Sequence, residues 1–459
     1  MDSRGLIRVA LATGFCMALI AGFAQGGGRG AAGPPGGFGL PNLPSAARGP
    51  MDLPDRARGE RNEALPEAAQ RGLSIAAEAR HAHERELWHA HRDALDFDSE
   101  EHLIVRGEIL ALAPSPQALA SAQAKGFAIR RQEALDGLDT AVIVLEAPRG
   151  MSLRRALGKL RSADPGGAYD YNHIYFASAV ASPPAGDLAS NPRNVAPKSS
   201  RDAIRVRRIG LIDGGVAGGH PALRSAVVHS HGCNGAPVPS EHGTAVASLL
   251  AATDGELPGS APKTELFAAD VYCGVPTGGA TDALIEALAW LTRERVPVIN
   301  VSLVGPPNAL LERAVNLAAD RGYLIVAAVG NDGPAAPPLY PAAYPPVVAV
   351  TGVDRSEKVL LEAERGRYVD FAALGADVMA ATLPDGRTQV RGTSFAAPIV
   401  ASLLADQLDH PDRTLAEQAV RELVASAVDL GARGYDPVYG NGLVGADPRA
   451  TSAPVAQSQ

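Results

Sequence analysis

The chain has 459 residues and a formal net charge of -8. This length is more than one domain usually needs, so we expect two or three folded units joined by linkers. The negative charge disfavours nucleic acid as a partner, because proteins that bind nucleic acid need a positive surface to neutralise phosphates.

The first 24 residues predict a secretory signal peptide. Arg4 and Arg8 precede an apolar run from Val9 to Phe23, and small residues follow near its end. These are the charged, apolar and cleavage regions of such a signal, and the run is short for a helix that spans a membrane. We therefore expect a secreted or periplasmic protein, with an uncleaved membrane anchor as the alternative.

Export also bears on the cysteines. Past the signal region the chain has only Cys233 and Cys273. An oxidising compartment favours a disulfide between them. Two buried free thiols are the alternative, and so few ligands make a metal site a poor interpretation.

Two segments of different composition follow the signal. Residues 25–60 are dense in Gly, Pro, Ala and Arg, which predicts a disordered spacer without a core. Residues 61–100 have a helix-forming composition and include the triplets His81-Ala82-His83 and His89-Ala90-His91. Because residues two apart on a helix point in different directions, we expect a solvated helical segment rather than a metal site.

Residues 101–178 predict a small α+β domain, and residues 179–203 a cleavable linker rich in Pro, Ala, Ser and Asn. The domain's apolar and helical patterns alternate as strand, helix, strand, strand, helix, strand, which is typical of a split βαβ sandwich. The expected elements are His102 to Leu112, Pro116 to Lys125, Phe127 to Gln132, Ala141 to Leu145, Ser152 to Ser162, and Tyr169 to Phe176.

Residues 204–448 predict an α/β domain, followed by a disordered tail over residues 449–459. Short apolar strands alternate with helical segments here, and this pattern is typical of a mostly parallel sheet with helices on both faces. The expected elements are Val206 to Ile212, His242 to Ala252, Glu265 to Val271, Ala280 to Arg295, Val298 to Leu303, Ala309 to Arg321, Tyr323 to Val329, Val347 to Val353, Thr393 to Asp409, and Thr414 to Ala427.

Four polar residues of this domain have the chemistry of nucleophilic catalysis. Ser394 lies between small residues at a predicted helix start, where a hydroxyl would be exposed. A serine nucleophile needs a base, a group that orients the base, and donors for an oxyanion. His242 and Asp213 are the expected base and orienting acid. Asn331, just past an apolar strand, offers an amide donor.

The order Asp, His, Ser, with an Asn before the Ser, is the subtilisin order. From about Ile204 to Ala446 the chain resembles the subtilisin-like serine proteases. The resemblance rests on several motifs found in order, which are Gly210-Leu211-Ile212-Asp213, Glu241-His242-Gly243-Thr244, Val298-Ile299-Asn300-Val301-Ser302-Leu303, Val329-Gly330-Asn331-Asp332-Gly333, Tyr340-Pro341-Ala342-Ala343-Tyr344-Pro345, Gly392-Thr393-Ser394-Phe395-Ala396-Ala397-Pro398, and Tyr439-Gly440-Asn441-Gly442-Leu443-Val444.

The resemblance implies roles for these residues. Asp213, His242 and Ser394 would form the triad, and Asn331 would help form the oxyanion hole. Four residues would pair with the substrate backbone as an added strand, namely Ser302, Leu303, Val304 and Gly305. The domain at residues 101–178 is similar in position to the family's inhibitory propeptide, and the segment Asp170 to Tyr175 resembles the strand that leads into the cleft.

Some positions depart from the family pattern. Gly214 follows Asp213 where the family usually has Ser or Thr, and Val304 stands where Gly is common. Thr253 to Ser260 lacks the acidic or amide-rich loop that holds calcium in many relatives. Since calcium needs several oxygen ligands and charge, we expect no metal there, and no cofactor elsewhere.

The sequence therefore predicts an exported serine endopeptidase, made as an autoprocessed zymogen. Its expected partners are polypeptide substrates and its own propeptide-like domain, and we expect a monomer. A pseudoprotease that binds without turnover is one alternative. A peptide acyl-transferase or ligase is another, since it would use the same catalytic residues.

Overall fold

The computed structural model describes residues 67–178, 206–252 and 263–445. The predicted signal peptide, spacer, linker and tail lie outside these ranges. All of these described residues belong to one compact unit. Within the described ranges, no helix is long and apolar enough to cross a membrane.

A seven-stranded parallel sheet is the centre of the C-terminal domain (residues 206–445). Its strand order is β14-β13-β12-β10-β7-β9-β8, and its strands are largely apolar because helices cover both faces. The predicted α/β class is confirmed. The strands are β7 (Arg207–Asp213), β8 (Val227–His231), β9 (Thr264–Asp270), β10 (Val298–Val301), β12 (Leu324–Ala328), β13 (Val347–Val353) and β14 (Phe371–Leu374).

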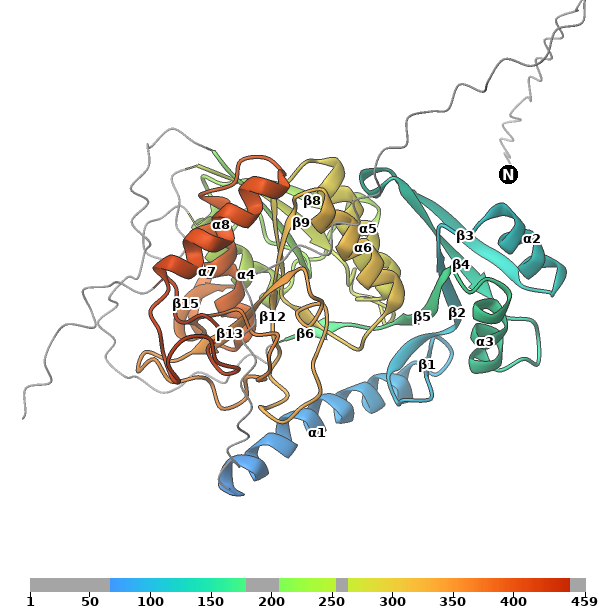
Figure 1. The fold of residues 1–459 in the computed structure, drawn as a ribbon, viewed down its shortest axis with the longest axis horizontal. Helices are drawn as coiled ribbons and strands as arrows, with labels where there is room; N and C mark the ends of the chain where they lie inside the picture. Colours follow the sequence, from blue (N-terminus) through green and yellow to red (C-terminus); the bar gives the residue numbers. More distant parts are fainter. Residues whose placement is uncertain (1–66, 179–205, 253–262, 446–459) are drawn as a thin grey trace, which may run out of the picture. The chain divides into compact units, whose positions relative to one another are not determined.

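Helices cover both faces of this sheet, as Figure 1 shows. One face carries α4 (Glu241–Ala251), α7 (Thr393–Ala405) and α8 (Arg413–Ser426), which share one apolar core. The other face carries α5 (Thr281–Arg293) and α6 (Ala309–Asp320), which share a second core. The sequence patterns did not predict β8 or β14, nor the antiparallel hairpin formed by β15 (Ala376–Thr382) and β16 (Gly386–Arg391). These strands are short, polar or alanine-rich, so they lack a clear apolar pattern.

The N-terminal domain (residues 91–178) is an antiparallel sheet of order β1-β2-β4-β3, with β5 also paired to β2. Its strands and helices follow the order predicted from the sequence. One face packs on the two helices, and the other face shares the core of α5 and α6 in the C-terminal domain. The elements are β1 (Leu95–Phe97), β2 (Leu103–Leu112), α2 (Pro116–Ala124), β3 (Ala128–Leu135), β4 (Thr140–Glu146), α3 (Leu153–Ala163) and β5 (Ala168–His173).

Helix α1 (Glu67–Ala90) precedes this domain. The helical segment predicted over residues 61–100 therefore ends earlier than expected, and β1 pairs with β2 through Leu95 and Val105. The expectation of a fully solvated helix is also wrong for one side of α1, because Glu84 is only 3% exposed.

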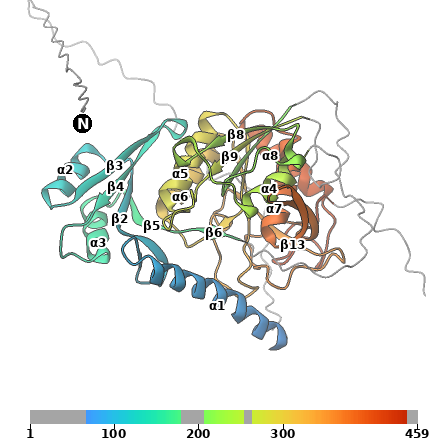
Figure 2. The same cartoon turned by 180° about the vertical axis from the view of Figure 1, so that it is seen from behind.

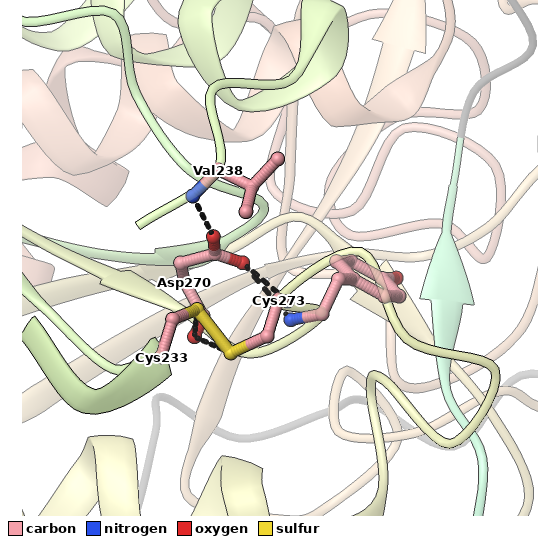
Figure 3. Close-up of a disulfide and its surroundings, with 5 residues drawn as sticks. Cys233, Val238, Asp270 and Cys273 are labelled. Carbon is pink, nitrogen blue, oxygen red and sulfur yellow. Dashed lines mark hydrogen bonds between the residues drawn. A yellow bond between two sulfur atoms is a disulfide. The ribbon is translucent and has the colours of Figure 1, made fainter. Parts of the chain in front are cut away.

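A disulfide joins Cys233 to Cys273, 40 residues apart (Figure 3). It links the turn after β8 to the turn after β9. Between the two cysteines, the Asp270 carboxylate accepts hydrogen bonds from the backbone N–H groups of Val238, at 2.8 Å, and of Tyr272 and Cys273, both at 3.0 Å. The bridge therefore fixes two loops at the carboxyl edge of the sheet.

Reduction of this disulfide should lower the free energy of unfolding by roughly 3–4 kcal/mol, because a closed loop of this length restricts the unfolded chain. Chemical denaturation of the oxidised and reduced protein measures the difference. Thiol titration under denaturing conditions is the control. The chain has three cysteines, and Cys16 lies in the predicted signal peptide. The exported protein should therefore show no reactive thiol before reduction, and the uncut chain one. Two further reactive thiols in either unreduced protein would contradict the bridge.

Candidate active site

Asp213 ends β7 at the carboxyl edge of the sheet, where open α/β sheets place their ligand sites. Its side chain is 1% exposed. A buried carboxylate needs hydrogen-bond donors to offset the loss of water. One is the backbone N–H of Gly214, 2.7 Å from Oδ1. The other is a histidine.

His242 is the second residue of α4, whose amino end is capped by the Ser240 hydroxyl accepting from Gly243 N–H. Its Nδ1 lies 2.9 Å and 3.0 Å from the two carboxylate oxygens of Asp213. Because an ionised carboxylate only accepts hydrogen bonds, Nδ1 carries the proton and Nε2 is left with a free lone pair. Nε2 is buried and has no hydrogen-bond partner among the described residues.

The departure at Gly214 has a packing explanation. A Cβ added at this position would lie 2.4 Å from the Ser240 Oγ. Ser240 is the residue that caps α4, so a larger residue at 214 would displace the helix that carries His242. Glycine permits this close approach, and its N–H still supports Asp213.

Ser394 is the second residue of α7 and is fully buried in this structure. Gly392, at the amino end of α7, has a φ of 140°, a backbone conformation that residues with a side chain rarely adopt. The Ser394 carbonyl accepts from the Ser302 hydroxyl at 3.1 Å. The Ser394 hydroxyl lies 3.4 Å from the Ser302 carbonyl. The motif that contains Ser302 and the motif that contains Ser394 are therefore in direct contact.

Asn331 lies in the loop after β12. Its Oδ1 accepts from the backbone N–H of Thr393 at 3.1 Å, next to Ser394. This contact fixes the orientation of the amide. The Nδ2 group is left buried and without a partner among the described residues. It is a donor available for an acceptor that enters the site.

The cleft beside Ser394 contains a strand from the same chain. Strand β6 (Phe176–Ala177) pairs antiparallel with β11 (Leu303–Val304), through Phe176 with Val304 and Ala177 with Leu303. The Ser178 N–H donates to the Ser302 carbonyl at 3.2 Å, and the Ser178 hydroxyl contacts that of Ser394.

Sequence patterns missed the side chains that anchor this strand. Tyr175 is fully buried and its hydroxyl donates to the Pro306 carbonyl at 2.7 Å. Its ring packs on Gly305, where an added Cβ would lie 2.5 Å from the ring. Gly305 itself forms a bridge with Tyr340 rather than with β6. The strand predicted over Tyr169 to Phe176 is broken between β5 and β6, so that Tyr175 turns into this site.

Comparison with known proteins identifies the domain that carries these residues. A sequence model of the subtilase family matches residues 207–442. The chain belongs to this family. The resemblance seen in the sequence motifs is thereby confirmed, and membership supports serine-type peptidase activity.

Individual relatives align over the same region. Subtilisin DY of Bacillus licheniformis is 32% identical over 257 residues, which cover 53% of this chain and 90% of that protein. Minor extracellular protease Epr of Bacillus subtilis (strain 168) is 31% identical over 221 residues, 48% of this chain but only 34% of that protein. This subtilase thus spans about a third of the length of Epr.

Among solved structures, fervidolysin from Fervidobacterium pennivorans, described as a keratinolytic enzyme related to subtilisin, has a similar fold. The TM-score is 0.61 at 20% identity, with 76% of this chain and 61% of that chain covered. At this identity the likeness concerns the fold alone.

Two groups of potential metal ligands occur among the described residues, and neither has a free ligand set. One comprises Asp270 with Cys233 and Cys273, whose sulfurs form the disulfide. The other comprises Asp98, His102 and His173, in which both histidines are hydrogen-bonded to Asp98.

The orientation of the Asn308 side-chain amide determines which ring nitrogen of His173 carries the proton. Its Oδ1 accepts from two N–H groups at the start of α6, so its Nδ2 donates to His173 Nδ1 at 2.9 Å. His173 Nε2 therefore carries the proton and donates to Asp98, at 3.3 Å. Burial would raise the pKa of Asp98, but hydrogen bonds from His102, His173 and backbone N–H groups outweigh it and hold that pKa well below its usual range.

Glu364 is a buried acid beside the loop that carries Asn331. Its Oε2 accepts from the Tyr368 hydroxyl at 2.9 Å and the Leu339 N–H at 3.2 Å. Its Oε1 has no partner among the described residues. Burial raises the pKa of Glu364 to about 8; the charge of Asp332 adds to this, while the Tyr368 hydrogen bond opposes it.

This raised pKa predicts a pH-dependent stability. Between the unfolded pKa near 4.5 and the folded pKa near 8, the folded state holds a proton that the unfolded state has released. The contribution of Glu364 is thus fully present below pH 4.5 and decreases, by about 1.4 kcal/mol per pH unit, as pH rises to 8. Denaturation of Glu364→Gln at several pH values should show a shallower decline than the parent, both carrying Ser394→Ala to prevent proteolysis. Glu422→Gln, on the exposed side of α8, should keep the parent's slope; equal slopes for Glu364→Gln and the parent would contradict the assignment.

Proposed function

We propose that this subtilase is an exported serine endopeptidase that hydrolyses peptide bonds through an acyl-enzyme and is made as an autoprocessed zymogen. The observation that carries the proposal is the occupied cleft. The chain's own residues 176–178 lie along β11 and reach Ser394. The ring of the next residue, Phe395, lies 5.6 Å from that of His242, which is hydrogen-bonded to Asp213.

We infer the following roles from the order of the motifs and from the hydrogen-bonded pair of Asp213 and His242. Ser394 Oγ attacks the carbonyl carbon of the scissile bond while His242 Nε2 accepts its proton. Asp213 keeps Nδ1 protonated and stabilises the imidazolium that forms. The histidine then returns the proton to the leaving amine, and water hydrolyses the acyl-enzyme by the same route.

We propose two donors for the oxyanion of the tetrahedral intermediate. One is Asn331 Nδ2, which has no partner among the described residues, while Oδ1 accepts from Thr393 N–H. The other is the backbone N–H of Ser394, one of the first N–H groups of α7, which have no partner within the helix. Both belong to fixed elements, so little reorganisation is needed when the charge develops.

Strand β6 supports a model for substrate binding and for maturation. Polypeptide substrates would pair with Ser302 to Val304 as β6 does, through backbone hydrogen bonds that tolerate many sequences. In the precursor the bond on the carboxyl side of Ser178 is the one that we propose is cut, because Ser178 N–H and hydroxyl both reach the site. A tethered strand has a high effective concentration, so no second enzyme is required.

The N-terminal domain would then act as an intramolecular inhibitor until it dissociates, with the enzyme acting as a monomer on other polypeptides. Export is supported by the signal-like first 24 residues. It is also in keeping with the relative Epr, which is named as a minor extracellular protease.

A fluorophosphonate should label the mature enzyme at Ser394 alone, since only a base-activated serine attacks such a phosphorus centre readily. The Ser394→Ala protein should stay unlabelled and keep the intact mass of the uncut chain. Mass spectrometry of both proteins measures both results. Absence of labelling in the folded, processed protein would favour the pseudoprotease alternative, and joined peptides in the presence of an added amine would favour the acyl-transferase.

Replacement of Asn331 by Ala should lower kcat by about a hundredfold with KM little changed, because the lost donor acts mainly on the transition state. Steady-state kinetics on a chromogenic peptide measure the effect. Asn331→Asp is the matched control, since it keeps the acceptor for Thr393 N–H but lacks the donor. It should be as impaired as Asn331→Ala. Recovery of activity in Asn331→Asp would show that the loss came from the loosened Thr393 contact instead.

A further inference from the structure

Helix α1 lies outside the sheet of the N-terminal domain and extends from β1 alongside β6, as both Figure 1 and Figure 2 show. Neither the split βαβ sheet nor the catalytic residues require such a helix. It contacts both domains at two separate places. These contacts indicate a function of its own.

The first contact is apolar and lies at the carboxyl end of the helix. Leu87 and Trp88 pack against a small cluster that includes Ile174 and Phe176, on either side of Tyr175, and Ala280 of the C-terminal domain. Earlier on the helix, the ring of His83 meets that of Phe176 edge to face at 5.8 Å. The helix therefore covers the segment that enters the cleft.

The second contact is ionic and lies near the middle of the helix. Arg80 Nε donates to Asp332 Oδ2 at 2.6 Å, while its NH1 group donates to Glu84 at 2.8 Å. The side chains of Arg80, Asp332 and Glu84 are only 17%, 9% and 4% exposed, so water screens the charges weakly. Glu84 holds the guanidinium in the orientation that reaches Asp332.

The position of Asp332 connects this ion pair to the active site. Asp332 directly follows Asn331, whose amide faces the amino end of α7. The chain of contacts thus runs from α1, through Arg80, to the loop that carries the proposed oxyanion donor. Removal of α1 would leave Asp332 without this partner, next to the buried Glu364.

Strand β6 needs such support. Its pairing with β11 involves only two residues on each strand, and a pair this short is weak by itself because few hydrogen bonds offset the entropy of ordering the chain. Tyr175 anchors one end of the segment. Helix α1 adds contacts to Ile174 and Phe176, on either side of that anchor.

We propose that α1 is a strap that holds β6 in the active-site cleft, fastened by the ion pair of Arg80 with Asp332, and that it acts as a second inhibitory element beside the N-terminal domain. This inference rests on the proposed protease function for its biological meaning. The mechanical part, that Arg80 secures residues 176–178, is independent of catalysis. The two parts are tested separately.

Hydrogen exchange measured by mass spectrometry tests the mechanical part in the full chain carrying Ser394→Ala. Adding Arg80→Ala should speed exchange about tenfold or more in α1 and in peptides that contain residues 176–178, since a hydrogen-bonded charge pair is lost. Arg85→Ala is the matched control, because Arg85 lies on the exposed side of the same helix. It should leave both regions unchanged.

Peptides from β2 and β10 report on whether each domain stays folded. If Arg80→Ala raises exchange there as well, Arg80→Lys, which keeps the charge but lacks the Nε donor, is measured in the same way. The proposal would be overturned if Arg80→Ala speeds exchange in α1 but not in residues 176–178, or if the Arg80 and Arg85 variants exchange at equal rates.

Autoprocessing tests the inhibitory part with Ser394 intact. Cleavage removes α1, so the wild-type and Arg80→Ala chains yield the same mature enzyme. Cleavage of the chain is followed by its intact mass, and release of the cleft by the rise of peptidase activity. If α1 is inhibitory, Arg80→Ala should shorten the delay between these two events by about tenfold. An unchanged delay would refute inhibition by α1. If no variant is ever cleaved or active, the proposed protease function fails, while the exchange result still decides the mechanical part.

Discussion

The buried carboxylate of Asp213 is the constraint on which the site depends. A charge that is 1% exposed at the end of a central strand must be paired, and His242 and the Gly214 N–H are its partners. To bring His242 within 3 Å, α4 must begin against the loop after β7, which leaves no room for a Cβ at residue 214. Sheet order, helix capping and one glycine thus combine to hold the imidazole with its second nitrogen free.

The second half of the site depends on Ser302. Its hydroxyl is oriented by Asn300 and donates to the Ser394 carbonyl, while its own carbonyl accepts from Ser178. The strand that receives an extended peptide is therefore bonded directly to the helix that carries the serine. The strand pairing at β11 and the position of Ser394 are thus linked through Ser302, which supports the proposal of a rigid cleft that recognises the main chain.

The chain's own residues 176–178 lie along β11 and are supported by three sets of contacts. The N-terminal sheet shares a core with α5 and α6, Tyr175 is buried against Gly305, and α1 lies over Phe176. Each contact alone is small. Because all three bear on the same few residues, their loss upon cleavage and dissociation would free the cleft in one step.

The sequence by itself determined the family, the α/β class and the order of most elements, because apolar periodicity and motif order are local properties of the chain. It also singled out Asp213, His242, Asn331 and Ser394, whose neighbours in sequence have the small or apolar character that such positions need. It did not indicate Arg80, Glu364 or Ser178. Arg80 and Ser178 matter through partners that lie 252 and 216 residues away in the chain, and Glu364 through the burial of an oxygen that has no partner among the described residues. Only the tertiary structure brings such groups together, since pairing across the fold leaves no periodic or local signal.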